Sequence, residues 1–169
     1  KPIPGADEFI GDLSKWDVLD VMNMNSMFQF AKSFNADLSK WDVSSVANMC
    51  AIFGEAESFN ADISKWDVSR VTDMHGMFGR ATSFNVDLTE WDVSSVTDMS
   101  KMFNEASSFK KVLSGAWFIS TANKQDMFEG SGGRMRASKT LSATTKTPRL
   151  PSAPPRNTAL RSILKLSRY

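Results

Sequence analysis

A period of 25 residues runs through most of the sequence and constrains its fold more than any other feature. The residues that recur at this spacing are aromatic or lie in a Met-Phe pair, which is once an Ile-Phe pair: Trp16, Trp41, Trp66 and Trp91; Phe9, Phe34, Phe59, Phe84 and Phe109; Met27-Phe28, Ile52-Phe53, Met77-Phe78, Met102-Phe103 and Met127-Phe128. A unit of this size has one layer of side chains and cannot enclose its own rings, so its neighbours must cover them. The sequence therefore predicts stacked repeats with aromatic ladders.

The repeats divide the chain into three parts. Residues 1–8 are the end of a truncated or capping repeat, residues 9–130 hold about five repeats (9–33, 34–58, 59–83, 84–108 and 109–130), and residues 131–169 form a tail. The fifth repeat loses its Asn and both Asp residues and places Trp117 one residue late, which is typical of a divergent C-terminal cap. The tail is basic and rich in Pro, Ser and Thr, so it cannot bury enough apolar surface to offset its ordering entropy, and we expect it to be disordered.

The hydrophobic spacing changes within each repeat. In the fourth repeat, apolar residues alternate with polar ones over 84–93 with one slip, which predicts a short strand and a bend. Over 96–106 they lie on one stripe of a helix of about two to three turns, which Thr97 or Asp98 can cap. The expected fold is a right-handed, leucine-rich-repeat-like α/β solenoid with one short parallel strand and one short helix per repeat.

The best repeats have closely similar sequences: FNADLSKWDVSSVANMCAIFGEAES from Phe34, FNADISKWDVSRVTDMHGMFGRATS from Phe59 and FNVDLTEWDVSSVTDMSKMFNEASS from Phe84. This pattern resembles the BspA-like leucine-rich-repeat surface proteins, a family that includes the mycoplasma lipoprotein-type 25-residue repeat. The resemblance covers Phe9 to about Gly130 and departs at Leu19-Asp20 and Ile52. It implies a surface-exposed or secreted adhesion module at an extracellular or cell-surface location, and it supplies no catalytic residues.

The net charge of +1 hides a division between the repeats and the tail. Residues 1–130 carry 11 Lys/Arg against 19 Asp/Glu, a net charge of −8, whereas residues 131–169 carry nine Lys/Arg and no acidic residue, a net charge of +9. The acidic residues include two rows at the repeat spacing, and these form the candidate binding face: Asp37, Asp62 and Asp87; Asp42, Asp67 and Asp92. Such rows can bind Ca²⁺, or each Asp can accept a backbone N–H in its own turn. The second interpretation is favoured because calcium-binding repeats also use Gly to bring carbonyl groups close, and Gly is absent there.

Two further sets of residues repeat with the same period. Asn35, Asn60 and Asn85 form either a side-chain ladder that satisfies buried backbone groups or a polar contact surface, and the ladder is favoured. Eight Met residues, from Met24 to Met127, lie on the inward stripe, which indicates core packing in preference to a soft-metal site.

Cys50 and His75 occupy the same repeat position and should be neighbours, so a Cys–His dyad is conceivable. The same position holds Asn25 and Ser100 in other repeats, and neither an oxyanion-hole Gly turn nor a third orienting residue accompanies the pair. We therefore expect no enzymatic activity, no cofactor and no metal site.

The tail has two interpretations. It is a solvated linker, or it docks on an anionic surface through Arg161, Lys165 and Arg168, which accompany a short amphipathic spacing. Nucleic acid is not the favoured partner, and no apolar run is long enough to span a membrane.

These features together predict a non-enzymatic protein-binding or adhesion module that presents an extended acidic face to a protein or a surface glycan. The alternative is a structural subunit of a larger complex, docked through the open end of the repeats and the basic tail. The expected state is a monomer or a subunit of such an assembly.

Overall fold

The computed structural model describes residue 13 and residues 15–138. The chain divides into two units, Lys1–Ser138 and Lys139–Tyr169, and the described residues all belong to the first unit. The predictions for residues 1–8, for disorder beyond Ser138 and for anionic contacts at Arg161, Lys165 and Arg168 lie outside the described residues.

The predicted right-handed α/β solenoid with a strand and a helix in every repeat is wrong. In the part of the chain that is described, the regular elements are one helix of four residues, α1 (Ala116–Ile119), and one parallel sheet of two strands, β1 (Val112–Leu113) and β2 (Arg134–Met135). All three elements lie after residue 111, and the repeats before them consist of turns and irregular backbone.

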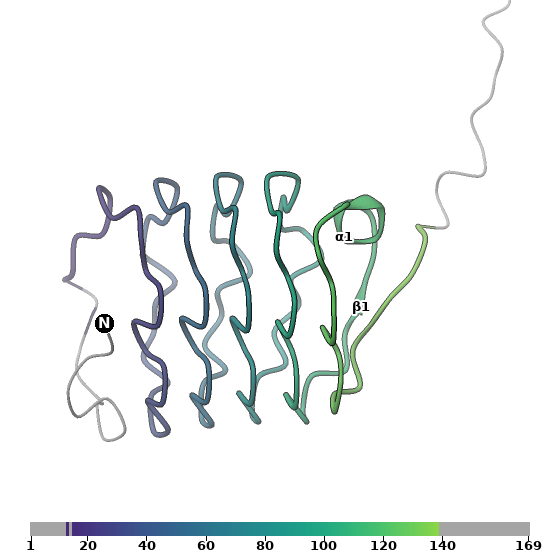
Figure 1. The fold of residues 1–169 in the computed structure, drawn as a ribbon. Helices are drawn as coiled ribbons and strands as arrows, with labels where there is room; N and C mark the ends of the chain where they lie inside the picture. Colours follow the sequence, from purple (N-terminus) through teal and green to yellow (C-terminus); the bar gives the residue numbers. More distant parts are fainter. Residues whose placement is uncertain (1–12, 14, 139–169) are drawn as a thin grey trace, which may run out of the picture. The chain divides into compact units, whose positions relative to one another are not determined.

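What the repeats share is a register of backbone contacts. Isolated parallel bridges join one residue of each repeat to its equivalent in the next, in the row Asn23, Asn48, Asp73, Asp98 and Asn123. Figure 1 shows these successive repeats lying side by side within the described unit, with α1 and β1 in the last of them. The 25-residue period is therefore the sequence separation of residues that pair with each other in adjacent repeats.

The segment predicted as helical forms turns because its N–H groups bond in another way. Alternate N–H groups of the second repeat donate to carbonyl groups of the third over 2.7–3.0 Å: Met49 to Asp73, Ala51 to His75, Phe53 to Met77 and Glu55 to Gly79. The N–H groups of Ile52 and Gly54 instead bond three residues back. Ala51 and Glu55 have φ values of 50° and 59°, a left-handed conformation that interrupts an α-helix. The same two positions have positive φ in every repeat from Ser26 to Gly130.

The core consists of the predicted aromatic and Met residues. Phe28, Phe53, Phe78 and Phe103 stack with ring centroids 5.5–5.8 Å apart from one repeat to the next. Seven of the eight Met residues assigned to the inward stripe are buried, and Met27 packs half-buried against them. The prediction of core packing for these residues is confirmed.

Each buried indole also joins two repeats. The Nε1–H groups of Trp41, Trp66 and Trp91 donate to the carbonyl oxygens of Leu13, Leu38 and Ile63, over 3.1–3.2 Å. Trp117 lies one residue late in the sequence, yet its Nε1–H still reaches the carbonyl oxygen of Leu88 at 2.9 Å. The extra residue is accommodated next to Gly115, which has a φ of 61° and directly precedes α1.

Residues 131–138, which the sequence assigns to the tail, pack against the last repeat. Here β2 pairs with β1, and Gly133 lies against the rings of Phe109 and Phe128, where an added Cβ would come within 2.6 Å of either. The N–H of Gly132 donates to the carbonyl oxygen of Phe109 at 3.0 Å. A side chain at position 133 would therefore require one of these rings to move.

Candidate functional site

The six aspartates of the candidate binding face are all exposed, and each holds a turn. The Oδ1 atom of each accepts the N–H of the residue two positions later, over 2.9–3.0 Å. In the second repeat, Asp37 and Asp42 precede turns in which the N–H of Trp41 bonds to Leu38 and the N–H of Val46 bonds to Val43. The favoured interpretation, that these aspartates accept backbone N–H groups, is confirmed, and the Asp-x-Ser or Asp-x-Thr sequence explains it.

The same contacts keep the carboxylates ionised. Hydrogen bonds from the hydroxyl and then the amide of Ser44 lower the pKa of Asp42, and Ser69 acts in the same way on Asp67. The neighbouring carboxylates of Asp42 and Asp92 raise the pKa of Asp67, but this is a smaller contribution and the net shift is downward. The pKa is likewise lowered at Asp37, Asp62, Asp87 and Asp92. The two rows are therefore lines of negative charge at neutral pH.

A shallow groove of about 550 Å³ lies near the second row, which consists of Asp42, Asp67 and Asp92, although none of these three aspartates lines it. The link is Ser69, which lines the groove and whose N–H donates to Asp67. The other lining residues come from two repeat positions and are mostly small or hydroxyl-bearing: Asp20, Ser45, Arg70 and Ser95; Met22, Ala47 and Thr72. Thr72 Oγ1 donates to the carbonyl oxygen of Ala47 at 3.2 Å, which ties two repeats together at the groove. Such a site can hold an extended chain that lies across several repeats.

The groove is the feature that the sequence analysis missed. Its signal in the sequence is the Ser or Arg that follows the second Asp row by three residues, as Ser45 follows Asp42 and Arg70 follows Asp67. The short side chains of Ser45, Ala47 and Thr72 leave a depression that spans neighbouring repeats, and Arg70 is part of its lining.

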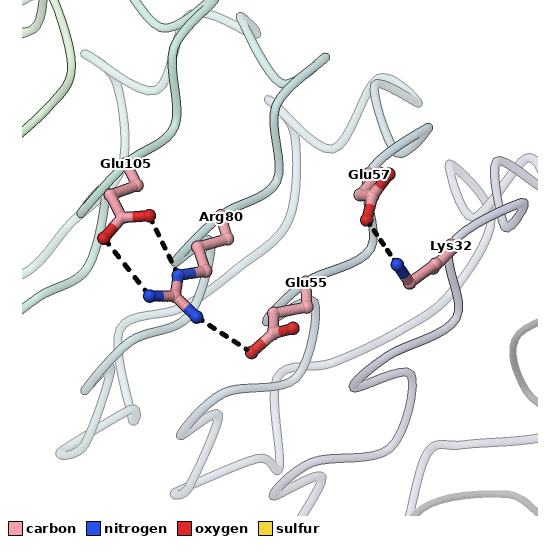
Figure 2. A network of polar contacts seen from close by, with 5 residues as sticks. All are labelled: Lys32, Glu55, Glu57, Arg80 and Glu105. Carbon is pink, nitrogen blue, oxygen red and sulfur yellow. Dashed lines mark hydrogen bonds and ion pairs between the residues drawn. The ribbon is translucent and has the colours of Figure 1, made fainter.

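A second hollow, of about 260 Å³, is lined by Glu55, Arg80 and Lys101, and the first two of these already form an ion pair with each other. It forms where Gly54, Gly76 and Gly79 take repeat positions that hold larger side chains elsewhere. Figure 2 shows that Arg80 lies between two glutamates of the adjacent repeats, with both oxygens of Glu105 at 3.0 and 3.2 Å and one oxygen of Glu55 at 3.7 Å. The nearby ion pair of Lys32 with Glu57, at 2.8 Å, has the same one-repeat spacing. These ion pairs join repeats to one another.

The structure does not assemble Cys50 and His75 into a nucleophile and a base. His75 Nδ1 lies 2.8 Å from Ser100 Oγ, and that hydroxyl donates to Asp98 Oδ1 at 2.5 Å. Burial raises the pKa of the Cys50 thiol, and the carboxylate of Asp73 raises it further. A thiol needs a lowered pKa for nucleophilic catalysis, and a serine nucleophile needs its carboxylate on the histidine.

The Asn row forms the predicted ladder. The N–H groups of Asn60 and Asn85 donate to Oδ1 of Asn35 and Asn60, at 2.8 and 2.9 Å, and the N–H of Lys110 continues the row to Oδ1 of Asn85 at 3.1 Å. The ladder lies at the surface, since Asn35 and Asn60 are exposed, so the backbone groups that it satisfies are not buried as expected.

Within residues 15–138 and at residue 13, no cluster of three or more His, Cys, Asp or Glu side chains could hold a metal ion. The same described residues include no helix with the length and apolar character needed to cross a membrane.

Comparison of the sequence with known families finds one matching family. No curated protein and no solved structure matches the chain. Two family matches, over residues 3–66 and 39–139, overlap and together cover all the described repeats. The chain therefore belongs to the family described as "Mycoplasma protein of unknown function, DUF285".

Proposed function

We propose that this protein is a non-enzymatic binding module that holds an extended segment of a partner protein in the groove beside Asp42, Asp67 and Asp92. One observation carries the proposal: a groove crosses several repeats, and a row of carboxylates with lowered pKa values lies near it. A partner segment with Lys or Arg side chains at intervals would complement this row.

The chemistry of the groove favours an extended peptide. Its hydroxyl groups offer donors and acceptors to a peptide backbone, and Met22 offers one apolar contact. Arg70 is the cation of the groove lining, and it would direct an acidic or carbonyl group of the partner to one place and so fix the register. Steering by the carboxylates would speed association and make it sensitive to salt.

The cell exterior is the proposed location. The mycoplasma family match supports the coarser part of the resemblance noted in the sequence, and the finer assignment, a BspA-like leucine-rich-repeat surface protein with an adhesive role, is part of the proposal. Adhesion by such a module would come from many weak polar contacts over several repeats.

The test uses the labelled full-length chain on an array of extended peptides of graded Lys/Arg content and on an array of surface glycans. We expect peptides rich in basic residues to be retained, with binding that weakens as salt is added. The informative variant is Asp42→Asn/Asp67→Asn/Asp92→Asn, because Asn can keep the turn hydrogen bond and loses the charge. Loss of three exposed ion pairs should weaken binding roughly tenfold or more.

The matched control is Asp73→Asn. Asp73 Oδ1 accepts the N–H of His75, and Asn48 makes the same contact to Cys50 one repeat earlier, so Asn is accepted at this position. The control should bind like the unmodified protein. Retention of glycans in place of peptides, or unchanged binding by the triple variant, would refute the proposal.

A further inference from the structure

The hollow of about 260 Å³ lies where the repeat pattern is interrupted. Gln29 and Asn104 occupy the same position in the first and fourth repeats, and the two repeats between them have Gly54 and Gly79 there. A Cβ added at Gly54 would meet no atom closer than 3.4 Å, so a side chain fits at this position. The missing side chains therefore leave a depression with glycine backbone at its floor and an amide side chain at either end.

Lys101 lines this hollow, and its charge has no partner in the part of the chain that the structure describes. Arg80 lines the same hollow but is already held between Glu105 and Glu55, as Figure 2 shows. An anionic group of a ligand would therefore pair with Lys101 in preference to Arg80.

His75 contributes an acceptor, and the contacts of its ring fix which nitrogen this is. The Ser100 hydroxyl donates to Asp98 Oδ1 at 2.5 Å, so its oxygen accepts from His75 Nδ1, which lies 2.8 Å away. Asp98 is ionised, because burial, which raises its pKa, is outweighed by hydrogen bonds that lower it, chiefly those from Ser100. In the neutral imidazole, Nε2 is therefore a lone-pair acceptor, and it has no partner among the described residues.

Glu55 is a second acceptor on the rim. Its carboxylate lies 3.7 Å from Arg80 Nη1, and Glu105 binds Arg80 more closely. A simple anion would pair with Lys101 but would meet the lone pairs of His75 Nε2 and Glu55. The ligand must therefore combine one anionic group with several hydrogen-bond donors, spread over the three repeats from which these side chains come.

We propose that this hollow binds a sugar residue that carries one carboxylate group. The carboxylate pairs with Lys101, hydroxyl groups donate to His75 Nε2 and Glu55, and the ring lies over the glycine backbone. Hydroxyl groups also suit the amide side chains at the two ends, because a hydroxyl both donates and accepts. A ligand of this size in so open a site binds weakly, with a dissociation constant on the order of 1 mM.

The test is an NMR titration of the isotope-labelled full-length protein with sodium glucuronate, a sugar acid with one ring. Glucose, which lacks the carboxylate, and alanine, which carries a carboxylate and an ammonium group but no hydroxyl, are the ligand controls. We expect glucuronate to shift the backbone signals of Gly54, Gly79 and Lys101. Glucose should bind roughly threefold to tenfold more weakly, and alanine at least roughly tenfold more weakly.

His75 is the only histidine in the sequence, so its ring nitrogens give an unambiguous signal. A proton–nitrogen correlation spectrum of the ring at pH 8 should show the proton on Nδ1 in the free protein, and the Nε2 signal should shift as glucuronate is added. A proton on Nε2 in the free protein would remove the acceptor and overturn the proposal.

Three variants alter the hollow with residues found at equivalent positions of other repeats: Gly54→Gln as in Gln29, Lys101→Ala as in Ala51 and His75→Ser as in Ser100. Gly54→Gln fills the depression and should weaken glucuronate binding at least roughly tenfold. Lys101→Ala should lower the affinity for glucuronate to that for glucose and leave glucose binding unchanged. His75→Ser should weaken the binding of both sugars roughly threefold.

Lys65→Ala is the matched control, because it removes an exposed cation that does not line the hollow. It should bind glucuronate like the unmodified protein, and circular dichroism checks that every variant is folded. Three results would contradict the proposal: no binding of glucuronate, equal binding of glucuronate and either ligand control, or unchanged binding of glucuronate by Gly54→Gln.

This test is independent of the peptide groove, because the hollow and the groove share no lining residue. The Asp42→Asn/Asp67→Asn/Asp92→Asn variant should bind glucuronate normally, and Gly54→Gln should bind basic peptides normally. Acidic glycans that the unmodified chain retains through the hollow should be lost from Gly54→Gln, which separates the two kinds of binding on an array.

Discussion

Each buried tryptophan brings one polar group into the core, and the acceptor of that group lies in the preceding repeat. The Nε1–H of Trp66 donates to the carbonyl oxygen of Leu38 at 3.1 Å, and the side chain is only 5% exposed. The indole therefore fills the core and also satisfies a backbone acceptor. Trp16 lies at the end of the described repeats, where it stacks on Trp41 and remains 45% exposed.

The substitution Trp66→Phe should destabilise the protein by about 1–3 kcal/mol, because it removes one of the two hydrogen bonds to the carbonyl oxygen of Leu38, which keeps only the N–H of Trp41, and leaves a cavity where the larger ring lay. The measurement is urea unfolding at low protein concentration, followed by circular dichroism. Trp16→Phe is the matched control and should change the free energy of unfolding by less than about 0.5 kcal/mol, since the residue is exposed. Equal effects of the two substitutions would contradict this role for the indole N–H.

A left-handed backbone conformation recurs in every repeat, at Ser26, Ala51, Gly76, Lys101 and Asp126. Gly76 is the one glycine in this row, and a Cβ added there would meet no atom within 4 Å. The substitution Gly76→Ala thus tests the backbone conformation without a steric clash. It should cost about 1 kcal/mol, since L-residues are disfavoured in this region.

Gly54→Ala is the control for that measurement. Gly54 lacks a positive φ, and its added Cβ would make ordinary contacts of 3.4–3.6 Å. The substitution should be neutral or stabilise the protein by up to about 1 kcal/mol, through reduced entropy of the unfolded chain. The midpoint of thermal unfolding should therefore fall for Gly76→Ala and stay unchanged or rise for Gly54→Ala. An equal fall for both variants would argue against the conformational explanation.

At the scale of the element, the unit of this fold is a turn closed by an Asp or Asn side chain. The second repeat contains three of them, with Oδ1 of Asp37, Asp42 and Asn48 each accepting the N–H two residues later. These turns replace the predicted strand and helix. They need only a short polar side chain at fixed places, which the sequence supplies in each of the four repeats with regular spacing.

The sequence contained enough information for the core and too little for the local backbone. A spacing such as Val96, Met99, Met102, Phe103 and Ala106 identifies the buried set in either a helix or a series of turns, and all five residues are buried. The deciding feature is the positive φ at Lys101 and Glu105, residue types that seldom mark that conformation. Inter-repeat hydrogen bonds impose it, and no local sequence signal reveals them.

Of the candidate binding face, the sequence predicted the aspartates and their hydrogen bonds but did not predict the groove. The Asp rows follow directly from the period, and Asp-x-Ser spacing gave their hydrogen bonds correctly. The groove next to them depends on how Ser45, Ser69 and Thr72 of different repeats pack together. That arrangement depends on the turns of each repeat, and the sequence predicted a strand and a helix in their place.

Acid should weaken these turns. Hydrogen bonding lowers the pKa of Asp42, Asp67 and Asp92 below the value of about 3.9 for an unfolded chain. The contribution of such groups to stability is complete above the unfolded pKa and is lost as the pH falls through it toward the folded pKa. We therefore expect the free energy of unfolding to decrease as the pH is lowered below about 4.

The variant Asp42→Asn/Asp67→Asn/Asp92→Asn isolates this effect. Asn accepts the same N–H and does not titrate, so the variant should lose less stability between neutral and acid pH than the unmodified protein. Urea unfolding at a series of pH values measures the difference. An identical pH dependence for both proteins would show that other carboxylates govern acid unfolding.

At the scale of the whole described unit, each repeat contacts chiefly the repeats on either side of it. The hydrogen bonds of the Asn and Trp rows, and the ion pairs of Arg80, all join adjacent repeats. In such an architecture, stability is the sum of local and nearest-neighbour contributions. A defect at one end should consequently loosen that end before it affects the middle.

Gly133 provides the test of this property, because an added Cβ would lie 2.6 Å from the rings of both Phe109 and Phe128. Gly133→Ala should cost about 1–3 kcal/mol through overpacking, and hydrogen exchange should show lost protection in residues 109–138. Residues 34–83 should keep their protection, since they do not contact the altered repeat.

Gly132→Ala is the matched control, since its Cβ would meet the flexible side chain of Lys110 at 3.1 Å. We expect nearly normal protection throughout that variant, because the Lys110 side chain can move. Loss of protection in all repeats of Gly133→Ala at once would mean that the described repeats unfold as one cooperative unit. In that case coupling between adjacent repeats exceeds their separate stabilities, and the end of the stack controls the whole.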